Sequence, residues 1–317
     1  MTIQAITKEL LDEYLFFQQH SIRASLIPGS EFNLIAQQVG TSRQEAYAQL
    51  SNHTTKERDL DGRDSFYGHI LVSEASRNEI LGGLRVRFSK GTQSPWSADT
   101  SYMEYSYPSF HERLTGKNCN YLEIGRVFVS VNARHDFRIL PTLMRSAGIL
   151  ARETDHRYLF GLMSFRDLNP DSNGDHIFAL EMQGQAQQQE LPIPIPRHPY
   201  YPDKQLAKAW YYYKSTIQNE EKFNSIDKLC TVINAFLGVS KEPNQSFRIP
   251  GFIRVYQKLT QAKPVGLSIA RGYNQIAEVL MFNNIASNSK GAQHDGLRIS
   301  IDASPIAACY TELGAHS

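Results

Sequence analysis

The segment YLEIGRVFVSV, residues 121–131, is apolar enough to form a buried β-strand, yet it carries Glu123 and Arg126 near its middle. Charged side chains are rarely buried unless they are paired or functional. The neighbours Leu122, Ile124 and Val127 make burial the expected state of this strand, and an unpaired charge there is strongly unfavourable. The alternative interpretation is a partly solvated ion pair at the end of a strand.

The spacing of the two charged residues predicts an irregularity in the strand. Positions three apart on a regular strand point to opposite faces of the sheet. Glu123 and Arg126 can share one face only if the strand bulges between them, and Gly125 is the residue that permits a bulge. We therefore predict a β-bulge at Gly125 that turns both side chains toward one cleft.

The elements around this strand indicate an α/β fold. Residues 66–73 and 79–88 read as two strands joined by a hairpin turn. A helix is expected over 139–154 and another strand over 158–165. Strand, helix and strand in this order form a βαβ unit with a right-handed crossover. The prediction is a twisted mixed sheet flanked by helices.

The rest of the chain is expected to be mainly helical, with a change of composition after the centre. Residues 89–118 are expected to be mostly loop, and residues 183–203 are rich in Gln and then in Pro, which is typical of a linker or an extended connector. In the run WYYYK, residues 210–214, the rings pack into the core or, alternatively, edge a lipid pocket or a membrane surface. Helices are expected at 5–19, 40–50 (with Thr41 or Ser42 as cap), 204–218, 225–238 and 249–259, a last strand at 276–285 and a strand-like piece at 296–301.

Composition excludes several classes of function. The 317 residues hold 33 Lys and Arg against 32 Asp and Glu, so nothing in the charge calls for a nucleic-acid partner. The three cysteines are far apart, which predicts neither a metal site nor a disulfide framework. We find no signal peptide and no apolar run of the roughly 20 residues that a membrane span needs. The expected location is the cytoplasm, with a peripheral position at the inner membrane surface as the alternative.

Three motifs, taken in this order, resemble the GNAT acyltransferase superfamily. They are an Asp-x-x-Asp-x4-His pattern, a Glu-x-x-Arg on the central strand, and a late "IP…Y..L.A…G" stretch that leads into a final strand. Within the superfamily the order is most similar to the long-chain N-acyltransferases, which include ornithine-lipid synthases, N-acyl amino acid synthases and, more distantly, acyl-homoserine-lactone synthases. The resemblance covers roughly residues 45–165 and 248–285; its motif residues are Asp61, Asp64, His69, Glu123, Arg126, Ile249, Pro250, Tyr256, Leu259, Ala262 and Gly266.

The sequence also departs from the family. It lacks the Arg-rich segment that often precedes the Asp motif, and residues 183–247 have no part that matches. The loop NARHDFR, residues 132–138, lacks the Gly-x-Gly with which small-acyl GNAT enzymes bind the pyrophosphate of CoA. A donor on acyl carrier protein has only a pantetheine arm, so this departure favours acyl carrier protein over CoA.

The resemblance implies roles for the charged residues. Glu123 would be the general base that takes the proton of the attacking amine. Arg126 would hold Glu123 in place or bind the carboxylate of an amino-acid acceptor. Asp64 would bind the acceptor's ammonium group, with Asp61 and His69 as further candidates; a polar turn for Asp61 and a core position for His69 are the structural alternatives.

A donor site is expected beside these residues. Backbone N–H groups of Val127, Phe128 and Val129 would contact the pantetheine arm or the oxyanion. The loop residues Arg134, His135 and Arg138 would bind the phosphate at the start of the helix at 139, where backbone amides and helix dipole favour an anion. The alternative is a solvated loop.

The functional prediction is transfer of a fatty acyl group from a thioester of acyl carrier protein or CoA to the amine of an amino acid or aminolipid precursor. No permanently bound cofactor and no metal are expected. The alternatives are an acyl-homoserine-lactone-type synthase and a non-catalytic module that binds acyl groups or the carrier. The expected organisation is a core over 1–182, a linker and helical insertion over 183–247, the end of the core over 248–287, and a polar tail over 288–317.

Overall fold

The computed structural model divides the chain into two compact units. The first holds residues 1–161 and 283–317, and the second holds residues 162–282. The domain boundaries expected from the sequence stay predictions. The structure describes residues 8–48, 58–76, 79–90, 95–167, 173–186, 191–201, 203–216, 226–238, 256–257, 260–270, 276–285 and 300–301.

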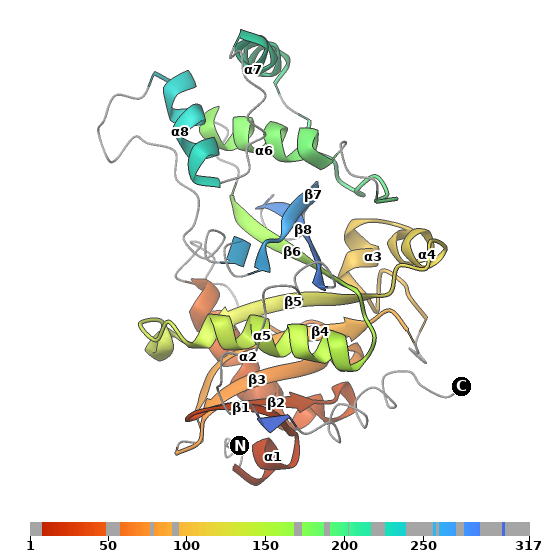
Figure 1. The fold of residues 1–317 in the computed structure, drawn as a ribbon, viewed down its shortest axis with the longest axis vertical. Helices are drawn as coiled ribbons and strands as arrows, with labels where there is room; N and C mark the ends of the chain where they lie inside the picture. Colours follow the sequence, from red (N-terminus) through yellow and green to blue (C-terminus); the bar gives the residue numbers. More distant parts are fainter. Residues whose placement is uncertain are drawn as a thin grey trace. The chain divides into compact units, whose positions relative to one another are not determined.

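A mixed β-sheet forms the centre of the first unit (Figure 1). Its strands lie in the order β6-β5-β4-β3-β2-β1-β9, and the pairs are antiparallel except for β5 with β6, which is parallel. The parallel pairing joins Tyr121–Ile124 to Tyr158–Gly161. The strands are β1 (Leu15–Gln19), β2 (Ile22–Ile27), β3 (Gly68–Glu74), β4 (Ile80–Phe88), β5 (Tyr121–Val129), β6 (Tyr158–Asp167) and β9 (Ser300–Ile301).

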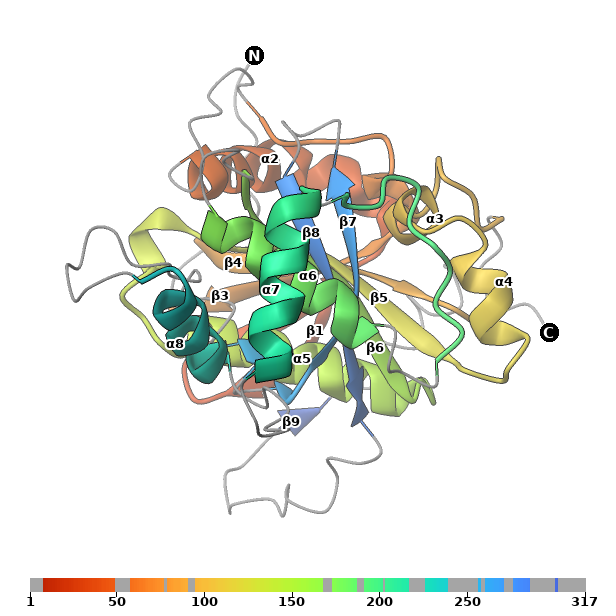
Figure 2. The same cartoon turned by 90° about the horizontal axis from the view of Figure 1, so that it is seen from above.

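Helices cover both faces of this sheet. Helix α5 (Ile139–Glu153) lies on one face, and α1 (Lys8–Glu13) and α2 (Phe32–Ala48) lie on the other (Figures 1 and 2). A buried apolar cluster packs α1 and α2 against the sheet; it includes Leu11, Ile35, Val39, Leu71 and Phe128. The predicted α/β sheet with flanking helices is confirmed, as are the strand–helix–strand elements at its centre.

The second unit is built around α6 (Asn173–Ala186) and the antiparallel pair β7 (Lys263–Ala270) and β8 (Ile276–Asn284). Helices α7 (Lys204–Thr216) and α8 (Ile226–Phe236) pack on α6. These two helices agree with the prediction within two residues at each end. No helix in the described part of the chain is long and apolar enough to cross a membrane.

Alternation along β4 and β5 separates apolar from charged side chains. Leu84, Val86 and Phe88 of β4 are buried, and by parity with Gly82, whose neighbours are Ile139 and Leu143, they face α5. Arg85 and Arg87 therefore face α2, opposite Gly125 and Glu123 of β5. The charged groups of the central strands thus gather on the α2 face of the sheet.

The predicted bulge in β5 is present, but not at Gly125. Arg85 pairs with Gly125 and Gly83 pairs with Phe128, so β5 has one extra residue between these pairs. Arg126, not Gly125, has the positive φ of 50°. The bulge therefore lies at Arg126 and Val127, and Gly125 pairs regularly with β4.

The N-terminal segment was predicted wrongly as one helix over 5–19. Among the described residues of this segment only α1 is helical, and residues 15–27 form the hairpin β1–β2, with Phe16 and Phe17 both buried. The stretch with a helical spacing of apolar residues is short. The β-sheet pairing of a run rich in Phe and Ile therefore outweighs it. The hairpin turns at His20, which has a φ of 55°.

The helix expected at 40–50 starts eight residues earlier, at Phe32. Gly40 therefore lies inside α2 and does not precede a cap at Thr41 or Ser42. A Cβ at position 40 would stand 2.8 Å from Leu60 Cδ2, and the Gly40 carbonyl accepts a hydrogen bond from the Asp59 amide at 3.0 Å. This glycine permits the close approach of the loop that carries Asp59 and Asp61.

Residues 89–118 were expected to be mostly loop; most of the described residues there are, but the expectation missed two short helices. Helices α3 (Tyr102–Ser106) and α4 (Phe110–Thr115) lie there. Ser101 caps α3 by accepting from the Glu104 amide at 3.1 Å, and the Glu104 carboxylate accepts from the Ser109 amide at 3.0 Å. Such short helices depend on tertiary contacts, so sequence periodicity does not reveal them.

Part of the prediction lies outside the described residues. This holds for most of the helix expected at 249–259, including Ile249, Pro250 and Leu259, and for most of the polar tail after residue 287. Tyr256 and Ala262 of the same motif are buried, and Gly266 lies in β7.

Candidate active site

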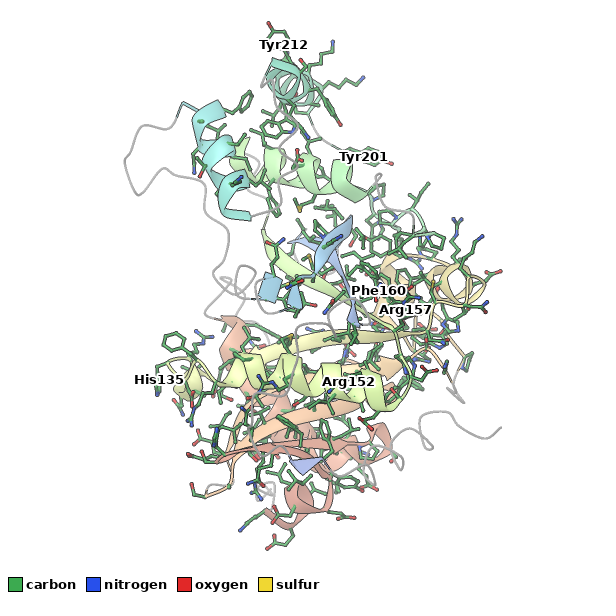
Figure 3. All side chains as sticks on the ribbon, viewed as in Figure 1. His135, Arg152, Arg157, Phe160, Tyr201 and Tyr212 are labelled. Atoms are coloured by element: carbon green, nitrogen blue, oxygen red, sulfur yellow. The ribbon has the colours of Figure 1, made fainter. Side chains whose placement is uncertain are left out.

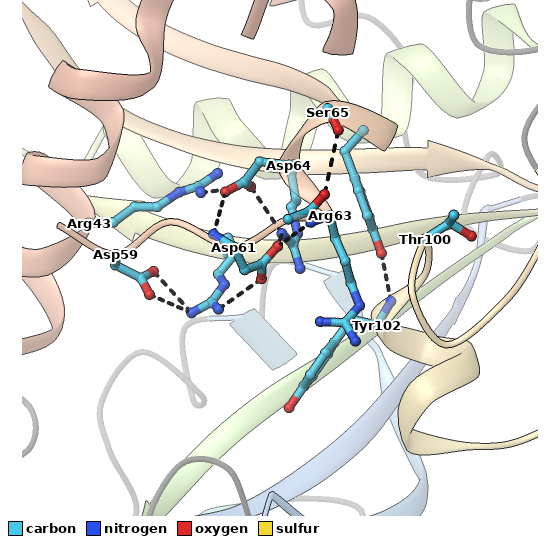
Figure 4. Close-up of polar contacts among 12 residues, drawn as sticks. Arg43, Asp59, Asp61, Arg63, Asp64, Ser65, Thr100 and Tyr102 are labelled. Atoms are coloured by element: carbon cyan, nitrogen blue, oxygen red, sulfur yellow. Dashed lines mark hydrogen bonds and ion pairs between the residues drawn. The ribbon is translucent and has the colours of Figure 1, made fainter. Parts of the chain in front are cut away.

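A loop after α2 brings three aspartates to the α2 face of the sheet. Asp64 is fully buried, and its Oδ1 accepts from Arg43 Nη1 at 2.9 Å and from Arg85 Nη1 at 3.0 Å. Arg43 comes from α2 and Arg85 from β4, so the carboxylate ties helix, loop and sheet together. Figure 4 shows these contacts around Arg43 and Asp64.

A second set of ion pairs reaches the bulge. The Arg126 guanidinium pairs with Asp59 at 3.0 Å and with Asp61 at 3.1 Å, and Asp61 also accepts from Arg85 Nη1 at 2.9 Å. The side chains of Arg126, Asp59 and Asp61 keep 14–16% of their surface exposed. This ion-pair network, made of Arg43, Arg85, Arg126, Asp59, Asp61 and Asp64, therefore meets solvent at its Arg126 end.

The network holds Asp61 and Asp64 ionised. Burial alone would raise the pKa of Asp61, but the attraction of Arg85 and Arg126 outweighs it and leaves that pKa far below its ordinary value. Burial also opposes ionisation of Asp64, and the charges of Arg43 and Arg85 again bring the pKa below its usual range. Asp61 thus presents a permanent negative charge at the partly exposed end.

His69 is the innermost member of the site. It is fully buried, stacks on Phe32 with ring centroids 4.3 Å apart, and donates from Nε2 to the Asp64 carbonyl at 2.8 Å. Its Nδ1 accepts from Arg43 Nη2 at 3.3 Å. Burial, and then the charge of Arg43, lower the pKa of His69 to about 3, so the ring is neutral at physiological pH.

Glu123 lies apart from Arg126. Its carboxylate is 2% exposed and accepts from the Tyr67 hydroxyl at 2.5 Å, the Ser101 hydroxyl at 2.7 Å and the Met103 amide at 3.0 Å. The Arg85 guanidinium stacks 4.4 Å from the centre of the Tyr67 ring, which links this cluster to the ion-pair network. Glu123 anchors the start of α3 to β5.

These contacts bear on the two roles expected of Glu123 and Arg126. Arg126 pairs with Asp59 and Asp61. Both Glu123 oxygens accept hydrogen bonds. A direct proton transfer from an amine would have to replace one of these donors.

The residues expected to bind the donor surround the start of α5. His135 and Arg138 are exposed, and Figure 3 shows His135 at the end of the loop. Arg138 pairs with Asp136 at 2.6 Å, and Arg134 donates to the Ala46 carbonyl at 2.6 Å. Asp136 therefore offsets part of the positive charge that the sequence indicates for this loop.

The three β5 residues expected at the donor differ in surroundings. Phe128 is a core residue, and Gly83 leaves room for its ring, since a Cβ there would be 2.7 Å from Phe128 Cε1. Val127 lies in the bulge, and its carbonyl accepts from the Tyr47 hydroxyl at 3.1 Å. Val129 pairs with Gly82.

Sequence reasoning missed Arg43, Tyr67, Arg85 and Ser101. One signal was available for Arg85, because GLRVRF, residues 83–88, alternates arginine with apolar residues in a strand. Buried carboxylates at 61, 64 and 123 also require cations or donors nearby. Arg43, Tyr67 and Ser101 come from segments whose placement only the tertiary structure reveals.

Comparison with protein families identifies this region. Residues 42–143 match the acetyltransferase (GNAT) domain. This segment is therefore similar to a GNAT domain. The match contains the end of α2, the aspartate loop, β3 to β5 and the start of α5, and it confirms both the superfamily resemblance and the expectation of an acyltransferase. The comparison with curated proteins finds no match.

Solved structures show only distant likeness. The acyl-homoserine-lactone synthase LasI is 16% identical, with 46% of this chain and 74% of that chain covered and a TM-score of 0.33. FeeM, an N-acyl amino acid synthase from uncultured soil microbes, is 12% identical, with 45% and 71% covered and a TM-score of 0.30. The loading GNATL domain of CurA from Lyngbya majuscula is 8% identical, with 84% and 98% covered and a TM-score of 0.37.

Proposed function

We propose that the protein transfers a fatty acyl group from an acyl thioester to the amine of an amino acid or of an aminolipid precursor. The observation that carries this proposal is the partly exposed end of the ion-pair network at the β5 bulge. Asp59, Asp61 and Arg126 there combine two carboxylates with one guanidinium. An acceptor with an ammonium and a carboxylate group matches this set of charges.

The reaction needs an amine that loses a proton and a carbonyl carbon that it attacks. Asp61 binds the ammonium form of the acceptor, and Arg126 binds its carboxylate. Glu123 takes one proton of the ammonium after the acceptor displaces the Ser101 or Tyr67 hydroxyl from the carboxylate. The amine then attacks the thioester carbonyl, the C–S bond breaks, and the pantetheine sulfur leaves as the thiol with the second proton. Asp64 and His69, both fully buried, act as positioning residues that hold Arg43 and Arg85.

The donor is proposed to lie along the second half of β5. The pairing of β5 with β6 joins Tyr121–Ile124 to its partner strand, and the residues of β5 beyond Ile124 include the bulge. Backbone N–H groups of residues 127–129 stabilise the oxyanion. The pantetheine phosphate binds at the start of α5, beside Arg134, His135 and Arg138.

Acyl carrier protein is the proposed donor. The absence of a Gly-x-Gly at 132–138 disfavours a cradled pyrophosphate. Arg138 and His135 are exposed and available to an acidic partner, and such docking weakens as salt screens exposed charges beyond about 10 Å at about 0.1 M.

Two measurements test this function. Mass spectrometry of lipid extracts from cells with and without the protein should reveal an N-acylated amine that depends on it. Competition between equal acyl chains on carrier protein and on CoA should favour the carrier, and Arg134→Ala/Arg138→Ala should raise the Michaelis constant of the carrier. Equal or better use of CoA, or an unchanged Michaelis constant, would contradict the donor assignment.

A further inference from the structure

Most of the strongly exposed apolar side chains come from one segment of the second unit. The large hydrophobic residues that are strongly exposed in the described chain are Leu34, Phe137, Ile195, Tyr201, Tyr211 and Tyr212. Four of these six lie between residues 195 and 212. Single exposed apolar residues are ordinary, whereas a group of them marks an interaction surface. The expectation that the run 210–214 packs into the core therefore holds for Trp210 and not for Tyr211 and Tyr212.

The inner side of α7 is fixed to its neighbours. Trp210 is 1% exposed, and its ring lies 5.5 Å from that of Phe236 in α8. Lys214 pairs at 2.7 Å with Glu181 of α6. These contacts hold the helix in one orientation about its axis and so fix which residues point outward.

The outward side of α7 is a stripe of lysine and tyrosine. Lys204, Lys208, Tyr211 and Tyr212 follow one another at spacings that place them on the same side of a helix. Tyr211 is 60% exposed and Tyr212 is 72% exposed, and both lysines are exposed as well. Figure 2 looks onto this side of α7, and Figure 3 shows Tyr212 pointing away from α6.

The charge of the stripe is positive. Lys204 and Lys208 make no ion pair with the residues that the structure describes. The nearest acidic residue along the chain, Asp203, accepts from the amides of Gln205 at 2.6 Å and Leu206 at 3.3 Å and so caps the helix. Its negative charge is therefore directed at the helix start.

We propose that the stripe formed by Lys204, Lys208, Tyr211 and Tyr212 docks on the surface of an anionic lipid bilayer. Tyrosine rings favour the boundary between lipid headgroups and acyl chains, and lysine stems lie along apolar surface while their ammonium groups reach the phosphates. Interfaces between proteins are instead poor in lysine and rich in arginine. This docking does not depend on the proposed acyl transfer.

Vesicle binding of the full-length protein tests the proposal. The protein should sediment with vesicles of phosphatidylcholine and phosphatidylglycerol more than with phosphatidylcholine alone, and the binding should weaken as salt is raised. Lys204→Gln/Lys208→Gln should lower partitioning about 30-fold, since each ammonium contributes about 1 kcal/mol and about 1.4 kcal/mol is tenfold. Tyr211→Gln/Tyr212→Gln should lower it about tenfold.

The control removes the same charge elsewhere. Lys8→Gln/Lys117→Gln alters two exposed lysines of the first unit and should leave partitioning within about twofold of wild type. Glutamine keeps the helix propensity of α7, and circular dichroism checks that each variant is folded. Equal binding to both kinds of vesicle, or α7 variants that bind like wild type, would overturn the proposal. So would light scattering that shows the α7 variants break a dimer, because the stripe would then join two copies.

Discussion

Arg126 combines an unusual backbone conformation with a charged side chain that forms ion pairs. It has a φ of 50°, which costs most residues about 1 kcal/mol or more relative to glycine. The bulge sustains this conformation because the guanidinium pairs with Asp59 and Asp61. The strain is placed at the partly exposed end of the ion-pair network, where the acceptor is proposed to bind.

Replacing Arg126 by two small residues tests the bulge. Arg126→Ala and Arg126→Gly both remove the ion pairs, and only glycine adopts a positive φ without steric cost. We expect Arg126→Gly to be about 0.5–1 kcal/mol more stable than Arg126→Ala in urea unfolding. The opposite order would indicate that residue 126 has an ordinary strand conformation.

Glu123→Gln separates a chemical role from a structural one. Glutamine can still accept from the Met103 amide and the Tyr67 hydroxyl, so we expect a loss of stability of about 1 kcal/mol. If Glu123 takes the amine proton, acyl transfer should fall about 10²-fold or more. If the folded variant turns over at a rate near that of wild type, Glu123 has no chemical role and only anchors α3.

The sequence indicated the charged positions better than their partners. Glu123, Arg126, Asp61, Asp64 and His69 were identified, and the structure brings all but Glu123 into direct contact with the ion-pair network. The partner of Arg126 was not predictable from spacing, because the bulge directs its side chain to the aspartate loop. Which cation meets which carboxylate depends on how α2 lies over the sheet, and no local pattern encodes that.

At the scale of elements, β4 and β5 approach closely where the bulge begins. A Cβ on Gly82 would lie 2.8 Å from the Phe128 carbonyl oxygen and 3.0 Å from Ile139 Cγ2 of α5. The first neighbour is backbone and cannot turn away. The glycine pair at 82–83 thus makes room for the bulged strand on one side and for Phe128 on the other.

We expect Gly82→Ala to destabilise the protein by about 1–3 kcal/mol, as overpacking of a close-packed interior does. Gly148→Ala is the matched control. Gly148 lies inside α5, and a Cβ there meets nothing within 4 Å. That change should stabilise by about 0.5–1 kcal/mol through helix propensity. Chemical unfolding of both variants measures the difference, and a neutral Gly82→Ala would refute the close approach.

Elements with strong local signals were predicted, and those that depend on tertiary contacts were not. The strands β3, β4 and β5 and the helix α5 follow from apolar alternation or helical spacing. The hairpin β1–β2, the early start of α2 and the helices α3 and α4 do not. Their partners are far away in the sequence. The hairpin pairs with β3, α2 packs against the loop at 58–60, and Glu123 anchors the start of α3.

At the scale of the whole molecule, buried neutral histidines make stability depend on pH. Burial lowers the pKa of His69 to about 3, and burial lowers the pKa values of His111 and His156 to about 4. In the unfolded chain these histidines have a pKa near about 6.5 and bind protons at a pH at which the folded chain does not. The stability of the fold is therefore greatest above about pH 6.5 and decreases as the pH falls.

The contribution of His69 to the pH dependence of stability is measurable. Between about pH 7.5 and about pH 5, its shift accounts for a loss of about 2 kcal/mol. His69→Gln keeps a donor for the Asp64 carbonyl and an acceptor for Arg43. Over this pH range we expect the free energy of unfolding of this variant to fall by about 2 kcal/mol less than that of wild type. Parallel pH profiles of the two proteins in urea unfolding would mean that His69 takes up a proton in the folded state.

The most direct test of the account is the rate at which purified protein moves a labelled fatty acyl group from a thioester to an amine, with wild type and Asp61→Asn side by side. Asp12→Asn, which breaks the ion pair with Arg23 in the N-terminal part of the chain, is the matched control. We predict amide formation by wild type and by Asp12→Asn, and a Michaelis constant for the amine at least about tenfold higher in Asp61→Asn. Two results would contradict a transferase site at the β5 bulge. One is that no amide forms with an acyl group on carrier protein or on CoA. The other is an unchanged Michaelis constant for the amine in the folded Asp61→Asn variant.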